Sequence, residues 1–344
     1  MSYRIFARLS ARSAVLGAVG AALLASTLLA GCNSTAGAGG STTLTPLTVG
    51  LTYVPNIQFA PFYVAEQLGY YKAAGLDVTL RHHNVGEDEF AAIAAGRENV
   101  IFASGDEVLQ ARSKGLPLVY VANVFTQYPV GLIVPANSPI QSLADLKGHT
   151  IGVPGQYGAT YIGLLDLLKS AGLSSSDVSI QTIGYTQVPS LIGHKVDAVM
   201  GYLNNEPIQF AQAGFAVRTF PASQAEPLVS NGLAAQEGEL KAQPAAIRAL
   251  IAATLKGVDY TIAHPQDALN LSKQFVPDLT GATAQASALK VLNATIPLMK
   301  PNATRPGYND PAAWQSMDSL MQSAGQLNSS VDMSKVYSND YLAS

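Results

Sequence analysis

The 344-residue chain has little charge and a single cysteine. Asp, Glu, Lys and Arg together make up 12% of its residues, and the formal net charge is −3. Without a block of Lys and Arg, the chain lacks the electrostatic footprint of nucleic-acid binding, so we expect no nucleic-acid partner. The lone Cys32 excludes a disulfide framework and any cysteine-rich metal site.

The sequence also lacks the short motifs of common catalytic sites. It contains no Gly-x-Ser-x-Gly elbow and no P-loop. The pair His82 and His83 is accompanied by no grouping of Cys, His and Asp at metal-ligand spacing, so a solvated pair is the simpler interpretation. We therefore expect no cofactor, no metal site and no catalytic residue, and we expect that the protein is not an enzyme.

Apolar residues, by contrast, are abundant. They make up 48% of the chain, which excludes a disordered protein. A chain of 344 residues is long enough to form two domains, each with a sizeable core.

The N-terminus has the layout of a secretory signal. Arginines at positions 4, 8 and 12 precede an apolar stretch, residues 14–30, and the stretch ends in small residues. The alternative is a transmembrane anchor, but the stretch is short and alanine-rich for a membrane span. We therefore expect residues 1–31 to be a signal peptide.

The segment Leu29-Ala30-Gly31-Cys32 resembles a bacterial lipobox, in which the cysteine is lipidated and becomes the mature N-terminus. Residues 32–46 are rich in Ser, Thr, Gly and Ala and are expected to be a flexible tether. The folded part would then be held by acyl chains at the cell membrane, facing the periplasm or the cell exterior.

Beyond residue 46, short apolar runs alternate with segments of helical periodicity. This alternation predicts an α/β protein with parallel sheets built from βαβ units. The expected strands are 47–51, 78–81, 100–103, 118–123, 131–134, 151–153, 179–183, 198–201 and 217–220. The last hundred residues are expected to be mostly helical, in segments 244–263, 265–275, 282–295 and 311–322.

The segment 150–165 reads as a strand, a tight glycine turn and the start of a helix. Gly155 and Gly158 permit positive φ and close backbone approach, and Thr160 is a candidate helix cap. Free N–H groups at such a helix start can hold electron-rich groups of a ligand. An ordinary βα turn is the alternative for this stretch taken alone.

Ligands of open α/β sheets collect at the carboxyl ends of the strands, where loops and helix starts converge. In this chain those loops carry tyrosine repeatedly and several acids, but no Lys or Arg. Phosphate, sulfonate or nitrate would require a cation. The loops instead favour a flat, uncharged or weakly basic ligand that bears hydroxyl or amine groups.

Each of these residues has a structural alternative: a tyrosine after a strand often packs, and an acid at a helix start often caps it. The candidate ligand-binding residues are Tyr53, Asn56, Phe59, Glu87, Asp88, Ser104, Asp106, Gln127, Tyr128, Gln156, Tyr157, Thr160, Tyr185, Gln187, Tyr202, Asn204 and Glu206.

Several segments resemble a known family. Residues 50–56 (GLTYVPN), 61–65, 69–78 and 142–148 are similar to periplasmic solute-binding proteins for thiamine pyrimidine precursors, a group that includes nitrate, taurine and alkanesulfonate receptors. Within that group, residues 53–63, 104–106, 152–163 and 202–207 resemble the riboflavin-binding branch. Pyrimidine-precursor receptors have a more glycine- and cysteine-rich segment where Gln156-Tyr157-Gly158 stands here.

The resemblance implies a type II periplasmic-binding-protein fold, with two lobes joined by two hinge crossings near 134–136 and 231–235. Lobe 1 would hold residues 47–134 and 235–344, and lobe 2 residues 135–234. The chain would be a monomeric, lipid-anchored receptor that delivers riboflavin or a related flavin to an ABC permease with its ATPase. The alternatives are an aminopyrimidine receptor, a sulfonate or nitrate receptor, and a pyrimidine-synthesising enzyme.

Overall fold

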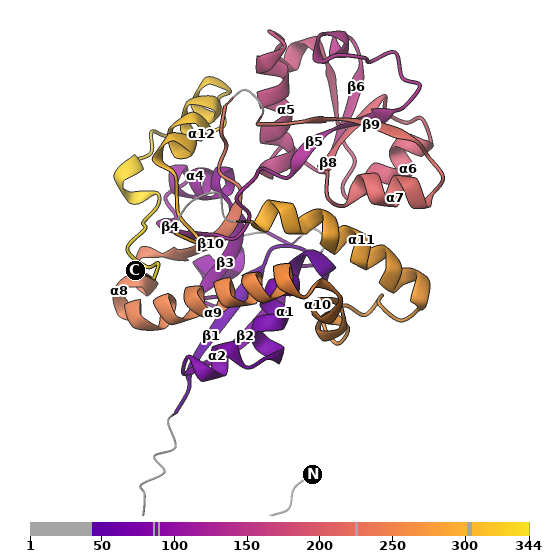
Figure 1. The fold of residues 1–344 in the computed structure, drawn as a ribbon. Coiled ribbons are helices and arrows are strands. Elements are labelled where there is room, and N and C mark those ends of the chain that lie inside the picture. Colours follow the sequence, from indigo (N-terminus) through magenta and orange to yellow (C-terminus); the bar gives the residue numbers. More distant parts are fainter. Residues whose placement is uncertain (1–42, 85–86, 89, 224–225, 301–304, 344) are drawn as a thin grey trace, which may run out of the picture. The chain divides into compact units, whose positions relative to one another are not determined.

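The computed structural model describes residues 43–84, 87–88, 90–223, 226–300 and 305–343. The expected signal peptide, Cys32 and most of the expected tether lie outside the described residues. Two five-stranded sheets organise the rest, and their elements are labelled in Figure 1.

The first sheet has the strand order β2-β1-β3-β10-β4. β1 runs parallel to β2 and β3, whereas β10 is antiparallel to both of its neighbours. The strands are β1 (Thr45–Leu51), β2 (Leu76–His82), β3 (Val100–Ser104), β4 (Leu118–Asn123) and β10 (Asn231–Gln236).

The second sheet has the order β7-β6-β8-β5-β9, and here β5 is the strand antiparallel to its neighbours β8 and β9. The strands are β5 (Val130–Pro135), β6 (Thr150–Val153), β7 (Ser179–Thr182), β8 (Ala198–Tyr202) and β9 (Val217–Pro221). The expectation of parallel sheets was therefore wrong at one strand in each. The chain enters the second sheet at β5 and returns to the first sheet at β10. Each of these strands follows a crossing and not the helix of a βαβ unit.

The crossings lie earlier in the chain than expected. Residues 124–129 lead from β4 of the first sheet to β5 of the second, and residues 222–230 lead back from β9 to β10. The expected lobe boundaries at 134/135 and 234/235 fall inside β5 and β10. Both are buried apolar strands of a sheet core, and the irregular segments just before them make the crossings.

Helices cover both sheets. In the first lobe α1 packs against α9 and α10, and α4 packs against α12, as their neighbouring positions in Figure 1 indicate. These helices are α1 (Ala60–Gln67), α2 (Tyr70–Ala73), α3 (Ala91–Ala94), α4 (Gly105–Ser113), α8 (Glu237–Ala242), α9 (Pro244–Ala263), α10 (Pro265–Ser272), α11 (Ala282–Met299) and α12 (Pro311–Ser323). In the second lobe they are α5 (Gly158–Ser170), α6 (Gln187–Ile192) and α7 (Glu206–Gln212).

Short 3₁₀ turns complete the fold: η1 (Ile57–Phe59), η2 (Leu143–Leu146), η3 (Ser175–Asp177) and η4 (Met333–Lys335). One apolar cluster fills the first lobe around β1, α1 and α9. A second cluster continues from α4 and α12 into β5, β6 and α5, so a shared core joins the two sheets.

The contact between α1 and α9 depends on Gly257. A Cβ atom at this position would lie 2.2 Å from the Pro61 carbonyl oxygen and 3.1 Å from the Ala65 Cβ. Since backbone cannot move aside cheaply, Gly257→Ala is expected to lower the free energy of unfolding by about 1–3 kcal/mol. Denaturant unfolding followed by circular dichroism measures this change.

Gly238 in α8 is the matched control, because a Cβ there would meet no atom within 4 Å. Gly238→Ala is expected to raise the free energy of unfolding by about 0.5–1 kcal/mol through helix propensity. Equal effects of the two substitutions would contradict the packing argument.

Candidate functional site

A cavity of about 290 Å³ opens between the two lobes, a volume near the lower end of ligand pockets. Its walls come from strand ends and the loops that follow them. The first lobe contributes Thr52, Tyr53, Val54, Gln58, Phe59, His83, Asn84, Glu87, Phe102, Glu107, Phe125 and Asn231. The second lobe contributes Pro154, Tyr157, Gly158, Ala159, Thr160, Gly184, Tyr185, Gln187, Tyr202, Asn205 and Glu206.

The glycine turn after β6 forms part of the second-lobe wall. Gly158 has φ +69° and is the first residue of α5, so the N-cap is Tyr157 and not Thr160 as expected. A Cβ on Gly155 would lie 2.2 Å from the Tyr157 ring, so only glycine lets that ring fold back over the turn. Tyr157 is 56% exposed, and its ring is therefore open to contact.

Aromatic rings line both lobes. Tyr53 of the first lobe meets Tyr185 of the second edge to face, with ring centroids 5.0 Å apart. Phe102 lies edge to face against Phe59 and against Phe125, each at a centroid distance of 5.7 Å. The cavity therefore offers flat apolar surfaces from opposite sides, as a ring-shaped ligand requires.

Glu206 is the most deeply buried acid of the cavity wall. One carboxylate oxygen accepts a hydrogen bond from the Tyr202 N–H at 2.7 Å, and the other accepts from the Asn205 amide at 3.3 Å. Burial raises the pKa of Glu206 to about 7 despite these bonds. Burial, then Glu206 and Tyr185, raise the pKa of Tyr53 to about 12.

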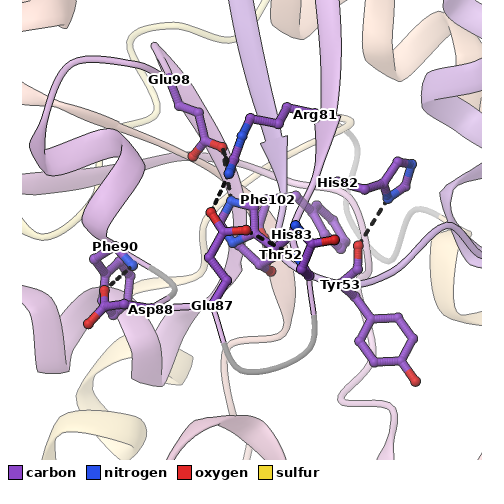
Figure 2. Close-up of polar contacts among 11 residues, drawn as sticks. Thr52, Tyr53, Arg81, His82, His83, Glu87, Asp88, Phe90, Glu98 and Phe102 are labelled. Atoms are coloured by element: carbon purple, nitrogen blue, oxygen red, sulfur yellow. Dashed lines mark hydrogen bonds and ion pairs between the residues drawn. The ribbon is translucent and has the colours of Figure 1, made fainter.

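Glu87 also lines the cavity, but its charge is paired. Figure 2 shows Arg81 between Glu87 and Glu98, with the Arg81–Glu98 contact at 2.6 Å. The other Glu87 oxygen accepts from the Asn84 N–H, and Arg81 followed by this backbone bond lowers the pKa of Glu87. Both Glu87 oxygens therefore already have partners within the first lobe.

His83 joins the same network. Its Nε2 lies 2.9 Å from the buried Glu98 carboxylate, and its ring lines the cavity. A Cβ at Gly50 would overlap that carboxylate, so the glycine of β1 makes room for it. The expectation of a solvated histidine pair is wrong for His83, which is buried.

Nine of the seventeen candidate residues line the cavity, and eight do not. The nine are Tyr53, Phe59, Glu87, Tyr157, Thr160, Tyr185, Gln187, Tyr202 and Glu206. Ligand contact by these nine stays a prediction.

Local capping and exposure account for four of the eight. The Asn56 side chain accepts from the Gln58 N–H and so caps η1, and Asp88 accepts from the Phe90 N–H (Figure 2). Gln127 and Gln156 are exposed and do not line the cavity. Asn56 and Asp88 each use a side-chain oxygen to accept a hydrogen bond within their own loop.

The other four are buried behind the wall. Ser104 is fully buried at the start of α4, where Glu107 accepts from its N–H at 2.7 Å. Burial, and then Glu107, raise the pKa of Asp106 well above its ordinary value.

Tyr128 and Asn204 connect the two lobes. The Tyr128 hydroxyl donates to the Ala159 carbonyl at 2.8 Å, and the Asn204 amide donates to the Thr295 hydroxyl of α11 at 2.8 Å. These two residues hold the lobes together instead of lining the cavity.

Sequence analysis missed several wall residues, among them Phe102, Phe125 and Asn231. Phe102 lies within the apolar strand β3, which reads as core, whereas Phe125 lies in the first crossing, close to the predicted Gln127 and Tyr128. Asn231 begins the antiparallel strand β10, whereas ligand sites in α/β proteins are expected at the carboxyl ends of parallel strands. A polar residue beside the expected crossing was the feature of the sequence that could have indicated it.

No three His, Cys, Asp or Glu side chains within the described ranges gather closely enough to hold a metal ion. In the same part of the chain, every helix is too short or too polar to traverse a lipid bilayer.

Solved structures with the same architecture include two ligand-binding proteins of bacterial transport. The aliphatic sulphonate-binding protein SsuA of Escherichia coli matches with a TM-score of 0.68 at 18% identity, covering 84% of this chain and 91% of that one. The nitrate-binding protein NrtA of Synechocystis matches with a TM-score of 0.64 at 13% identity, covering 87% of each chain. The fold is thus the two-lobed periplasmic-binding-protein fold, and the expected fold class is confirmed.

The sequence narrows the class further. Residues 56–268 match the model of the NMT1/THI5-like family, and the chain belongs to that family. It is 35% identical to the riboflavin-binding protein RibY of Chloroflexus aurantiacus over 87% of each chain. It is 31% identical to a formylaminopyrimidine-binding protein of Halalkalibacterium halodurans, covering 72% of this chain and 76% of that protein. The family resemblance expected from the motifs is confirmed.

The raised pKa of Glu206 predicts a pH-dependent stability. The carboxyl is neutral in both states below its ordinary pKa of 4.5, so the folded state then carries no penalty. As the pH rises towards 7 the unfolded chain ionises first, and folding loses about 3 kcal/mol.

Glu206→Gln stays neutral and avoids this loss. Its free energy of unfolding, relative to wild type, is therefore expected to grow by about 3 kcal/mol between pH 4.5 and about pH 8. Denaturant titrations of both proteins across this range measure the difference. A difference that does not change with pH would show that Glu206 ionises normally.

Proposed function

We propose that the protein is a lipid-anchored receptor of an ABC importer that binds riboflavin or a related flavin between its lobes. The observation that carries this proposal is the cavity wall, to which both lobes contribute tyrosines and the first lobe also contributes phenylalanines. None of the described residues lining it is a lysine or arginine. The 35% identity to a riboflavin-binding protein supports the same ligand class.

The wall chemistry matches the two parts of a flavin. Tyr157, Tyr53 and Tyr185 would contact the faces and edges of the tricyclic ring. Gln58, Thr160 and Gln187 would hydrogen-bond the ribityl hydroxyls, since all three line the cavity. Ring burial would supply affinity, and the polar groups would fix orientation.

Binding between the lobes would be coupled to closure. Ligand contacts to both lobes favour the closed form, which a membrane permease with its ATPase could then distinguish from the open form. This role requires recognition and release but no bond-making step, so we propose a receptor and not an enzyme.

A thiamine pyrimidine precursor is the second candidate. The cavity volume of about 290 Å³ favours a ligand smaller than a flavin. Glu206 could accept a hydrogen bond from the exocyclic amine of an aminopyrimidine, and a relative at 31% identity is a formylaminopyrimidine-binding protein. A sulfonate or nitrate would find no lysine or arginine among the described wall residues to pair with its negative charge.

Riboflavin fluorescence tests the leading proposal. Titrating purified protein into micromolar riboflavin is expected to quench the fluorescence, because stacked tyrosines relax the excited flavin. The competing titration uses a formylaminopyrimidine in a calorimeter. Heat from the pyrimidine without any flavin quenching would replace the leading proposal with the second candidate.

Repeating the riboflavin titration with Tyr157→Ala tests whether the Tyr157 ring contacts the flavin. Losing a stacking face is expected to weaken flavin binding by about 1–3 kcal/mol. Tyr308→Ala is the matched control, because Tyr308 is also an exposed tyrosine but does not line the cavity between the lobes. Equal affinities for the two variants would remove Tyr157 from the site.

Cys32 is the proposed site of lipidation, although it lies outside the described residues. Cys32→Ser is expected to move the protein, expressed in a bacterial host, from the membrane fraction to the soluble extracytoplasmic fraction. Labelled palmitate should be incorporated into wild type and not into the variant. A wild-type protein that incorporates no labelled palmitate would contradict lipid anchoring through Cys32.

A further inference from the structure

Asn231 fastens the two crossings to each other. It is the first residue of β10, at the point where the second crossing enters the first sheet. Its backbone carbonyl accepts hydrogen bonds from the N–H groups of Val124 and Phe125 in the first crossing, at 3.1 and 2.8 Å. Any force on Asn231 therefore acts on both crossings.

Asn231 also lines the cavity, and the residue is only 6% exposed. Its Oδ1 atom is buried and has no hydrogen-bond partner among the described residues. Buried amide oxygens are almost always paired, because an unpaired one loses its water without compensation. An unpaired acceptor in a cavity wall marks the position where a ligand donor fits.

Asn205, a second asparagine of the cavity wall, shows the contrast. Its amide nitrogen donates to Glu206, and its amide oxygen accepts from Gln209 at 3.1 Å. Both ends of Asn205 are therefore engaged within the second lobe. Of these two cavity asparagines, Asn231 is the one whose oxygen is left for a ligand.

The surroundings of Asn231 indicate what kind of ligand it would contact. Phe125 and Phe102 both line the cavity, and their rings meet edge to face. The N–H of Phe125 also donates to the Asn231 carbonyl. A polar acceptor beside such rings suits a flat heteroaromatic molecule that carries an N–H or O–H group. Carbocyclic aromatics would leave the oxygen unpaired.

We propose that Asn231 determines specificity at the flavin site, its Oδ1 accepting a hydrogen bond from the ligand. Because its backbone carbonyl holds the first crossing, the same contact braces the hinge when ligand is bound. This inference rests on the proposed function. In an oxidised flavin the available donors are the ring N–H and the ribityl hydroxyls.

Two substitutions of similar size test the assignment. Asn231→Leu removes the acceptor, whereas Asn231→Asp retains it. We expect Asn231→Leu to weaken riboflavin binding about 10- to 100-fold and Asn231→Asp to keep affinity within about threefold. Equal losses in both variants would mean that the ligand uses the amide N–H₂, and would overturn the proposal, as would an unchanged affinity of Asn231→Leu.

Lumiflavin, which has the ring N–H but no ribityl chain, identifies the donor. If the ring N–H donates, Asn231→Leu weakens lumiflavin as much as riboflavin; if a ribityl hydroxyl donates, only riboflavin is affected. Wild type is measured in the same titrations. Should wild type bind neither flavin, the proposed function fails, and Asn231 is then tested with a formylaminopyrimidine by calorimetry under the same criteria.

Asn123→Ala is the control for hinge damage. Asn123 pairs in register with Gly232, the neighbour of Asn231, but its amide donates to the Tyr308 carbonyl and it does not line the cavity. We expect unchanged flavin affinity for this variant. Thermal melts of all variants confirm folding.

Hydrogen exchange measures the bracing. In wild type, saturating riboflavin is expected to slow exchange at the Val124 and Phe125 amides at least tenfold. In Asn231→Leu at saturating riboflavin this slowing should fall below about twofold. Equal slowing in both proteins would overturn the bracing role.

Discussion

The insertion of β10 between β3 and β4 is the constraint on which the rest of the molecule depends. The chain that returns from the second lobe is hydrogen-bonded along both edges inside the first sheet. One end of the second crossing is therefore fixed in a core, and Asn231 ties it to the first crossing. With both connections anchored, the strand ends of the two lobes face a common cavity, where loops from β1, β6 and β8 supply the wall.

Charge in that cavity is balanced locally. Arg81 pairs with Glu87 from behind the wall, and burial raises the pKa values of Glu206 and of Asp106. The surface presented to a ligand is consequently aromatic and weakly polar. The sulfonate- and nitrate-binding neighbours share the fold at 18% and 13% identity, which shows that ligand choice belongs to the wall and not to the architecture.

Local signals predicted much of this arrangement. Strand and helix alternation, the glycine turn before α5 and the tyrosine-bearing loops all follow from short-range periodicity and backbone freedom. The wrong expectations about topology share one cause: pairing between distant segments. The antiparallel direction of β5 and β10 and the position of the crossings are set by neighbouring strands that no local pattern reveals.

By itself, the sequence determined the α/β class, the family, and nine residues of the cavity wall, because those depend on local periodicity and on motifs with fixed spacing. The tertiary structure alone decided which polar groups are open to a ligand. Asn56 and Asp88 cap their own loops, Tyr128 and Asn204 join the lobes, and Asn231 keeps an unpaired oxygen at the cavity. The hydrogen-bond partners of a side chain depend on which residues folding brings beside it, and the identity of the residue alone does not reveal them.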